Sequence, residues 1–487
     1  MRGLLRSGLL FFSCIYLSGF CKAQLSQNDQ ALAIPATEAK IDSFYVKNLF
    51  ILGNRITKEQ VILRELDFRT GDKIPKNTID SYLEVERNKV FNTNLFITAD
   101  ILYDVLSKDT VNIRLILKER WYIFPIPLLE IADRNFNEWI NNRGADLSRL
   151  NYGVYFTQKN FRGRNESLKL RLQFGFNKRF SLKYIVPFLN KRQTTGLTIE
   201  TGYSESNQIA YNDSNNIFQE FPLVDTDEKQ VVYRAFNLGT TFHLRQAFYY
   251  THHLNLQFNH NWVADSVSIL NPDFFLDGRN TQKYLQLSYT FERNFKDFSA
   301  YPLKGSYLEI TFNKTGLFVF NDLNMSSIDF TYSRYLPLSK KFFFASGVIG
   351  KVSFPDEQPY DNFKALGYKQ NIIRGFDNYV VGGQHIGIWK NTLRFKAFEK
   401  RFNMERLMPV DQFNTIPLSI YPKIYFDAGY IKNANVTEQN ARLTNKSLWG
   451  AGLGLDIITF YNSIFRLEYS YNSFDGFKPF IYFSADI

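Results

Sequence analysis

The stretch Asn371-Ile372-Ile373-Arg374-Gly375-Phe376-Asp377-Asn378-Tyr379, continued by Val380-Val381-Gly382-Gly383, decides how the whole chain is interpreted. It is a long loop that contains glycines, and segments of alternating polar and apolar residues flank it on both sides. The tripeptide Arg-Gly-Phe has no specificity by itself. Its position gives it weight, because eleven strand-like segments precede it and five follow it.

The composition restricts how this chain could cross a membrane. Aromatic residues make up 17% of the 487 residues, and the mean hydropathy is −0.27. No run of eighteen apolar residues follows the N-terminus, which excludes spanning helices. Only a closed β-barrel could then cross a bilayer, because lipid offers no partner for exposed backbone groups. The 48 Phe and 29 Tyr residues suit an apolar band with aromatic girdles, although composition alone also fits a large soluble β-protein.

The first 23 residues are typical of a secretory signal peptide. Arg2 and Arg6 form the charged start, an apolar core follows, and a small-x-small cleavage site ends at Ala23. The apolar core is too short to span a membrane as a helix. A lipid-modified Cys21 is the minority alternative, because the bulky Phe20 precedes it where a small residue is preferred.

Cysteine and charge exclude several classes of site. Both cysteines, Cys14 and Cys21, lie inside the signal, so the mature chain would contain neither disulfides, thiolate metal sites nor cysteine nucleophiles. The signal holds three basic residues and no acidic one, so its removal lowers the formal charge from +11 to about +8. The remaining Lys and Arg residues are scattered singly through strands, so we expect no nucleic acid as a partner. A lumen and an outer rim that face lipid phosphates explain the surplus better.

Residues 24–40 form a polar, flexible lead, and a small α+β pattern follows it. A first strand over 44–51 ends in the turn Gly53-Asn54. Thr57 with Gln60 predicts a capping box at the start of a helix that runs to about Leu66. The remaining elements are a break at Gly71-Asp72, a helix over 78–91, and strands over 96–105 and 111–118.

From residue 120 onward, segments of about ten residues or more alternate polar and apolar side chains, as in Leu168 to Phe176. A period of two places one set of side chains on lipid and the other in a polar lumen. In a soluble sandwich the apolar set would face a partner sheet, but sandwich strands are commonly about five or six residues long. We predict sixteen strands, centred near residues 126, 154, 170, 183, 199, 237, 256, 287, 310, 330, 348, 392, 424, 452, 467 and 482.

Loop lengths give the barrel an orientation. Connections on the N-terminal side are mostly tight, whereas several on the far side are long and polar, as in outer-membrane barrels. The long connections span residues 207–228, 264–280, 355–383 and 432–445. The segment 401–416 is an exception, because it is a long connection on the N-terminal side, where the other connections are mostly tight.

These features resemble the BamA/TamA superfamily of outer-membrane assembly and translocation barrels. The Arg-Gly-Phe loop resembles the sixth extracellular loop of that family. Residues 41–119 resemble its periplasmic POTRA domain, with matching marks at Gly53-Asn54, Thr57, Arg64-Glu65-Leu66, Gly71-Asp72 and Asn94-Leu95-Phe96. Two further stretches are similar to the family's turn between the second and third strands and to its last hairpin: Asn160 to Asn165, and Trp449 to Leu455 with Phe465 to Tyr469.

The resemblance implies a mainly β fold, in which a 16-stranded antiparallel transmembrane β-barrel follows one small α+β (β-α-α-β-β) POTRA domain. The expected organisation is a signal peptide (1–23), a flexible lead (24–40), a POTRA domain (41–119) and a barrel (120–487). An exposed sheet edge of the POTRA domain can accept an extended client strand. A spacer domain with blunted edges is the equal alternative.

Arg374 is the first candidate functional residue, because a guanidinium on a loop folded into a barrel needs a fixed acidic partner. Asp427 is predicted to point into the lumen beside the small Gly429, and this strand resembles the family's Asp-x-Gly strand, whose acid engages the loop arginine. Such a pair at contact is worth about 4 kcal/mol at an effective dielectric near 20, before desolvation costs. Gly375 would turn the loop tip with φ > 0, and Phe376 would pack on the lumen wall. The alternative is a solvated external loop whose arginine meets only water.

The seam between the first and last strands is the second candidate site. Pro125 and Pro127 lie in the predicted first strand and Pro479 in the last. Proline lacks the backbone N–H that would donate to the neighbouring strand, and it normally avoids central strands. The position of these prolines therefore suggests incomplete hydrogen bonding between the first and last strands, and a lateral gate there. The alternative places these prolines beyond the paired region. In the resembled family, opening of this seam is thought to admit client strands.

We predict no enzyme, no cofactor and no metal site. The chain has no Gly-x-Ser-x-Gly elbow, Walker loop or His-Glu-x-x-His motif. The adjacent His252 and His253 would point to opposite faces of a strand and could not chelate one metal together.

The resemblance implies insertion of outer-membrane proteins or translocation of a client. The expected location is the outer membrane of a Gram-negative bacterium, with the POTRA domain in the periplasm. The implied partners are unfolded outer-membrane or secreted client proteins, outer-membrane lipids, and periplasmic or lipoprotein accessory factors. The alternative is a passive porin or structural barrel, closed by its long inward loop.

Overall fold

The computed structural model describes residues 42–132, 139, 144–190, 192–222, 231–320, 322–367, 371–404, 415–436 and 441–484. The predicted signal peptide and flexible lead lie outside the described residues, as do residues 405–414 of the segment that broke the loop-length rule.

A small α+β unit comes first in the described chain. Its elements are β1 (Ser43–Leu52), α1 (Glu59–Leu63), β2 (Lys73–Pro75), α2 (Ile79–Phe91), β3 (Phe96–Ser107) and β4 (Thr110–Glu119). The strands form one sheet in the order β2-β1-β4-β3, with β1 and β4 parallel. Helix side chains such as Val61 and Val90 pack with strand side chains such as Val46 and Ile113 in one buried apolar core. The three-residue β2, which pairs with β1, was not predicted, because so short a strand shows no alternation.

The capping box predicted at Thr57 is wrong. Helix α1 begins at Glu59, its N-cap is Lys58, and no side chain caps it. The hydroxyl of Thr57 instead donates to the carboxylate of Glu119 at 2.6 Å, and α1 ends at Leu63 rather than near residue 66. A long-range hydrogen bond therefore replaces the local one that the sequence suggested.

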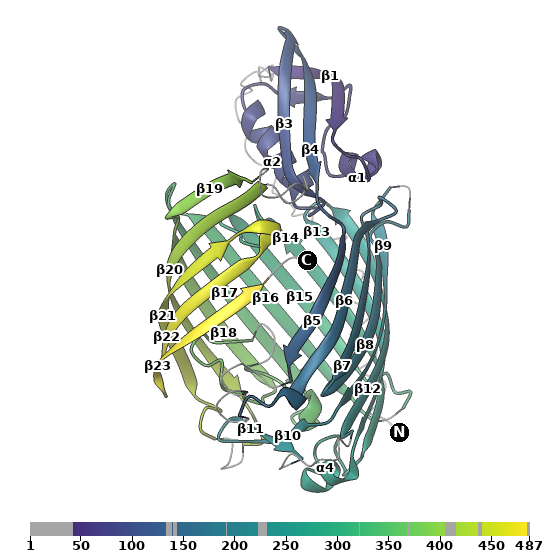
Figure 1. The fold of residues 1–487 in the computed structure, drawn as a ribbon, viewed down its shortest axis with the longest axis vertical. Helices are drawn as coiled ribbons and strands as arrows, with labels where there is room; N and C mark the ends of the chain where they lie inside the picture. The colour runs from purple at the N-terminus through teal and green to yellow at the C-terminus, as the bar shows by residue number, and fades with distance from the viewer. Residues whose placement is uncertain are drawn as a thin grey trace, which may run out of the picture. The chain divides into compact units, whose positions relative to one another are not determined.

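The remainder of the chain forms a closed antiparallel barrel (Figure 1). Its strands are β5 (Ile123–Ile131), β6 (Leu150–Phe161), β7 (Glu166–Gly175), β8 (Asn177–Val186), β9 (Thr195–Ser206), β12 (Tyr233–Ala247), β13 (Tyr250–Val263), β14 (Thr281–Asn294), β15 (Gly305–Thr315), β16 (Met325–Pro337), β17 (Phe342–Phe354), β18 (His385–Phe395), β19 (Phe398–Asn403), β20 (Thr415–Lys432), β21 (Ser447–Ile458), β22 (Ile464–Asn472) and β23 (Gly476–Ser484).

Two of these strands share one position in the wall. Both β18 and β19 pair with β20, first through Arg394 with Lys423 and then through Phe398 with Ile420. The extra residue on the β18–β19 side is a β-bulge, which interrupts the strand without adding a new one. The seventeen strands of the described sheet therefore occupy sixteen positions. This confirms the predicted sixteen-stranded barrel, and every predicted strand centre falls inside an observed strand.

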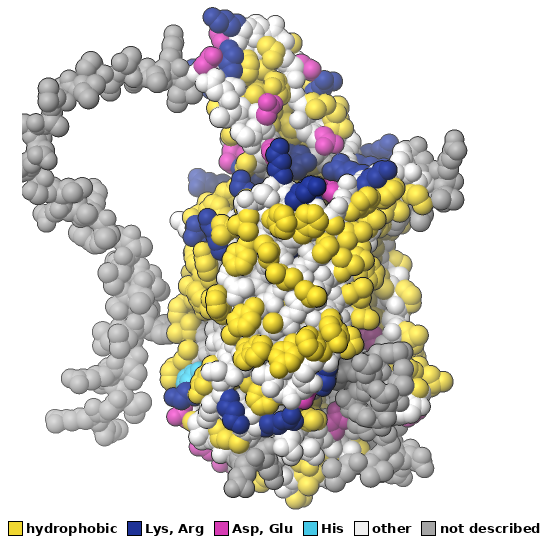
Figure 2. All heavy atoms as spheres, turned by 90° about the vertical axis from the view of Figure 1, so that its left-hand side faces the viewer, with side chains coloured by type: hydrophobic (Ala, Val, Ile, Leu, Met, Phe, Trp, Pro, Cys, Tyr) yellow, Lys and Arg dark blue, Asp and Glu magenta, His cyan; other side chains and the backbone are white. Residues whose placement is uncertain are grey.

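The barrel wall follows the predicted alternation. In β20 the apolar Ile424 and Phe426 are exposed, whereas Lys423, Tyr425 and Asp427 between them are buried. On the face that Figure 2 shows, hydrophobic side chains spread over the outside of the barrel, and the visible Lys and Arg side chains lie near its two margins. The apolar set therefore faces outward and the polar set faces inward, which distinguishes this fold from a sandwich.

Two of the long far-side connections contain structure that the sequence did not predict. Strands β10 (Ile209–Ser214) and β11 (Ile217–Phe221) form a hairpin, and α4 (Asp265–Leu270) lies in the next long connection. Side chains of these connections, including Phe274 and Phe275, form a small apolar core at that end of the barrel. Short 3₁₀ turns occur at η1 (Leu147–Arg149), η2 (Tyr360–Asn362) and η5 (Phe460–Asn462). No described helix is both long enough and apolar enough to cross a membrane.

Candidate functional site

The structure brings Arg374 and Asp427 together inside the barrel. The Arg374 Nε donates to Asp427 Oδ2 at 2.8 Å, and Nη2 donates to Oδ1 of the same carboxylate. The backbone N–H of Arg374 also donates to Asp427 Oδ2 at 3.1 Å. Asp427 is fully buried on the inward face of β20, and the Arg374 side chain is 12% exposed. The loop between β17 and β18 is therefore attached to the inner wall through a bidentate, charge-assisted ion pair.

Three further groups of the wall hold the same guanidinium. Nη1 donates to the hydroxyl of Thr392 at 3.0 Å, and Nη2 donates to the carbonyl oxygen of Asn391 at 3.1 Å. The guanidinium lies 4.0 Å from the ring centroid of Tyr425. A buried charge is costly unless it is paired and hydrogen-bonded. Arg374 meets both conditions, so its position is fixed from several directions.

Glycines of the wall make room for the loop backbone. A Cβ on Gly450 would lie 2.0 Å from the carbonyl oxygen of Arg374, and a Cβ on Gly429 would lie 2.7 Å from Ile373 Cδ1. Gly375 has φ +96°, a conformation that favours glycine. The sequence identified Gly429 as a small neighbour of Asp427, but the role of Gly450 appears only when β21 is placed beneath the loop.

The tip of the loop also contacts the last two strands. Asn472 Nδ2 donates to the carbonyl oxygen of Gly375 at 2.6 Å, and the hydroxyl of Tyr482 in β23 donates to Asp377 Oδ1 at 2.6 Å. Phe376 is buried, with its ring centroid 6.0 Å from that of Phe474 in the β22–β23 turn. Sequence reasoning missed Tyr482 and Asn472. The alternation of side chains in the last strand was the only signal for Tyr482. It predicts that this side chain points into the lumen, but it does not predict which residue it contacts.

A second buried charge network lies beside the loop anchor. Lys423 Nζ donates to Asp456 Oδ1 and to Glu468 Oε1, each at 2.6 Å. The hydroxyl of Tyr301, in the β14–β15 connection, donates to Asp456 Oδ2 at 2.7 Å. This connection therefore reaches strands that are not its neighbours in the sheet order. Sequence reasoning missed this network, because single charges on separate strands give no local pattern.

The three predicted seam prolines all lie inside ladders with their inner neighbours. Pro125 and Pro127 pair with Phe156 and Val154 of β6, and Pro479 pairs with Tyr469 of β22. The sheet order places β23 next to β5. The alternative that these prolines lie beyond the paired region therefore does not hold for the inner side of either strand.

The ladder geometry shows which way each proline nitrogen points in β5. In an antiparallel ladder, successive residues direct their N–H and C=O groups to alternate neighbours. Lys159 N donates to Tyr122 O at 2.7 Å, and Ala132 N donates to Arg149 O at 2.8 Å. Even-numbered residues of β5 therefore bond β6, and odd-numbered residues face β23. Both β5 prolines are odd-numbered, so both remove a donor from the side that faces β23.

The same rule applies to β23. Thr459 N donates to Ser463 O at 2.9 Å, which assigns the odd-numbered residues of β22 to β21. The even-numbered residues of β22 therefore bond β23, where their partners are also even-numbered, as in Asn472 with Gly476. Pro479 is odd-numbered and faces β5. Prolines thus remove backbone donors from both sides of one seam.

The predicted turn residues of the small unit form tight local structure. Gly53 and Gly71 have φ values of +93° and +98°. A Cβ on Gly53 would lie 1.9 Å from the carbonyl oxygen of Leu117, so this position requires glycine. Asn54 Nδ2 donates to the carbonyl oxygen of Thr57 at 3.2 Å.

Thr57 also belongs to a contact between the small unit and the barrel. Asn160 Nδ2, at the end of β6, donates to the Thr57 hydroxyl at 2.8 Å, and Lys58 N donates to the carbonyl oxygen of Gly163 at 2.9 Å. On the other side of the small unit, Arg245 of β12 forms an ion pair with the buried Glu65 at 2.9 Å. The sequence indicated the turns around Thr57 and Asn160 as separate local features. It did not reveal that they contact each other.

The fold and the inward loop define this chain as an outer-membrane β-barrel of a Gram-negative bacterium. Residues 160–473 match the model of the Omp85 superfamily domain, and the chain therefore belongs to the Omp85 superfamily. This membership confirms the resemblance that the sequence motifs indicated. The search of curated proteins found no match.

Two solved structures share the fold. BamA from Haemophilus ducreyi lacking POTRA domains 1–3 is 16% identical, with a TM-score of 0.50, and the alignment covers 91% of this chain and 84% of that one. CdiB from Escherichia coli is 10% identical, with a TM-score of 0.52, and the alignment covers 91% of this chain and 76% of that one. At these identities the likeness concerns the fold.

Proposed function

We propose that this protein is a non-enzymatic factor that inserts or exports client proteins at the outer membrane. Family membership supports the general class. The observation that carries the proposal is the seam, where Pro125 and Pro127 of β5 and Pro479 of β23 each lack the N–H that would bond the facing strand. A seam that lacks these backbone hydrogen bonds costs less free energy to open than the same two strands would if they were fully bonded. We assign it the role of a lateral gate for client strands.

The inward loop supplies the second part of this proposal. Arg374, Gly375, Phe376, Asp427 and Gly429 act as the anchor that holds the loop in the lumen. The contact of Asp377 with Tyr482 connects the same loop to the last strand. In this scheme, the loop stabilises the position of β23 while the gate is closed.

The small unit, which we assign to a POTRA domain over residues 41–119, would receive clients in the periplasm. Its edge strand β3 has a neighbour on one side only, and its apolar Leu102, Val105 and Leu106 are exposed. An extended client segment could pair with such an edge through backbone hydrogen bonds. Its partners would be unfolded outer-membrane or secreted proteins, together with outer-membrane lipids and accessory lipoproteins or periplasmic factors.

A passive porin or structural barrel is the second candidate function. The loop anchored at Arg374 inside the lumen favours it, because a fixed inward loop restricts a channel as well as it supports a gate.

Depletion of the protein in its native host distinguishes the two functions. Loss of an assembly or export factor should leave defined client proteins unfolded in the periplasm, detected by protease sensitivity and by loss of their heat-modifiable form on gels. Loss of a porin should change only the uptake of small solutes. Normal assembly of all outer-membrane and secreted proteins, together with a changed solute permeability, would reject the proposed function.

A further inference from the structure

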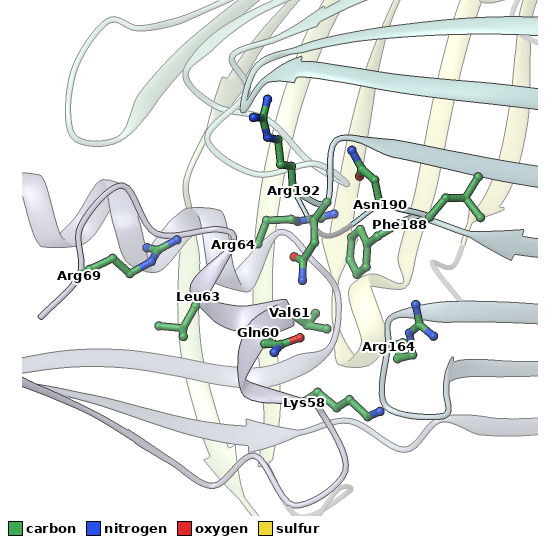
Figure 3. Close-up of a pocket in the computed structure, with 12 residues that line it drawn as sticks. Lys58, Gln60, Val61, Leu63, Arg64, Arg69, Arg164, Phe188, Asn190 and Arg192 are labelled. Carbon is green, nitrogen blue, oxygen red and sulfur yellow. The ribbon is translucent and has the colours of Figure 1, made fainter.

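A basic pocket lies between α1 of the small unit and the β8–β9 connection of the barrel (Figure 3). Its volume is about 810 Å³. Five cationic side chains line it, and none of its lining residues is acidic: the cations are Lys58, Arg64, Arg69, Arg164 and Arg192. In Figure 3 they come from the segment around α1, from the β6–β7 turn and from the β8–β9 connection, so the positive charge surrounds the space.

Two acidic side chains beside the pocket, Glu65 and Glu166, pair with the pocket residues Arg64 and Arg164 and also with cations outside the pocket. Glu65 pairs with Arg245 as well as with Arg64, and Glu166 pairs with Arg162 at 2.8 Å. Within the described part of the chain, Lys58 and Arg192 form no ion pair. Their charge is therefore not neutralised by the protein, and it is available to an anionic ligand.

The pocket borders the lipid-facing wall. Leu182 of β8 and Ile199 of β9 are exposed on the outside of the barrel, at 44% and 49%. Leu189, which lines the pocket, is exposed at 54%. Phe188 beside it is buried, and the Arg64 guanidinium lies 3.8 Å from its ring centroid. An apolar surface thus leads directly to a cluster of cations, on the periplasmic side of the membrane.

We propose that this pocket binds the phosphate of a glycerophospholipid from the periplasmic leaflet, with the acyl chains lying along the outer faces of β8 and β9. Arginine and lysine bind phosphate oxygens through charge-assisted hydrogen bonds, and cations at a membrane surface attract anionic lipid headgroups. A free phosphate ion would satisfy the same cations but not the exposed leucine beside them. The bound lipid would contact the small unit and the barrel at once. The proposal requires only the outer-membrane location, and it is independent of whether the protein inserts or exports clients.

The test uses the full-length protein in detergent, titrated with short-chain phosphatidylglycerol and, separately, with inorganic phosphate. The pocket variant combines Lys58→Gln with Arg192→Gln, because both side chains are exposed. The control combines Lys340→Gln with Lys341→Gln, which removes the same charge from exposed positions in a periplasmic connection of the barrel, between β16 and β17. A heat-modifiability gel verifies that both variants are folded.

Phosphatidylglycerol should bind the pocket variant roughly thirtyfold more weakly than the unchanged protein, since each of the two cations contributes about a fivefold step in affinity. The control should keep the original affinity, and inorganic phosphate should not displace the lipid at millimolar concentration. Equal lipid affinity in the pocket variant would overturn the site. Displacement by inorganic phosphate at the lipid's own affinity would overturn the assignment to a lipid. If the pocket variant does not fold, the pair Arg69→Gln and Arg192→Gln answers the same question.

Discussion

At the scale of single residues, Arg374 shows how a charge can be stable inside a barrel. Its guanidinium gives up water but gains the Asp427 carboxylate, the Thr392 hydroxyl and a backbone carbonyl oxygen. Breaking a buried pair by removing one partner typically costs about 3–5 kcal/mol, because the other charge is left uncompensated. The contact therefore anchors the loop only while both the Arg374 guanidinium and the Asp427 carboxylate are present.

The first prediction concerns this pair. Arg374→Glu should release the loop, because two carboxylates would then face each other in a buried space. Adding Asp427→Arg should restore part of the anchoring. Limited proteolysis of the loop and the temperature of barrel unfolding measure the effect, and Arg179→Glu, at an exposed arginine of β8, is the control. Additive damage in the double variant would contradict the pairing.

A second prediction uses the glycines beneath the loop. Gly450→Ala places a Cβ 2.0 Å from the Arg374 carbonyl oxygen, so the loop must move away from β21 by more than an ångström. Gly387→Ala is a matched control in β18, because nothing lies within 4 Å of its added Cβ. Proteolysis should cut the loop faster in Gly450→Ala than in Gly387→Ala. Equal rates would show that the loop does not rest on this glycine.

At the scale of elements, the small unit and the barrel are joined through contacts that local patterns did not reveal. Thr57 and Glu65 lie near the ends of α1, and their partners Asn160 and Arg245 lie in the barrel. Glu65 is buried. Burial alone raises the pKa of Glu65, but Arg245 and Arg64 outweigh this effect and lower it from the ordinary value of 4.5.

The third prediction follows from that direction. Because the folded pKa is lowered, the contribution of Glu65 is fully present above pH 4.5 and is lost as the pH falls through the lowered value. The protection of the α1 amides, measured relative to their intrinsic exchange rate at each pH, should therefore fall in acid, and Glu65→Gln should show lower protection already at pH 7. The exposed Glu84→Gln in α2 is the control. An unchanged pH profile in Glu65→Gln would contradict a role for this carboxylate in docking.

At the scale of the whole molecule, closure of the barrel depends on a seam whose two strands carry prolines on the facing side. Ladders of paired residues run round the described barrel from β5–β6 to β22–β23, and the sheet order closes the barrel by placing β23 next to β5. The three prolines leave this junction without three backbone donors, which is the observation behind the proposed gate. In the proposed function, β5 and β23 would thus both close the barrel wall and form its gate.

The fourth prediction tests whether opening the seam matters. The mature chain would contain no cysteine, so one cysteine in β5 and one in β23 can be joined without competing thiols. Cross-linking the seam should abolish client assembly and reduction should restore it. A control pair at Leu238 and Phe258, which face each other across β12 and β13, should have no effect. Full activity with a locked seam would reject the lateral gate.

The sequence by itself determined the barrel, its sixteen strand positions and the place of the long loop. A period of two is a local property, because side chains alternate across a strand whatever lies beside it. It also pointed to Arg374 and Asp427, since a buried arginine needs an acid on an inward position. The helices were predicted in kind, but the cap at Thr57 was wrong, because a distant carboxylate competed for its hydroxyl.

Only the tertiary structure decided which distant residues meet. Gly450 beneath Arg374, Tyr482 beside Asp377 and Tyr301 on Asp456 come from segments far apart in the chain. The same holds for the prolines, whose facing side depends on the register of β5 on β6 and of β22 on β23. Register and contacts between remote segments result from closing the sheet, and no stretch of sequence carries that information alone.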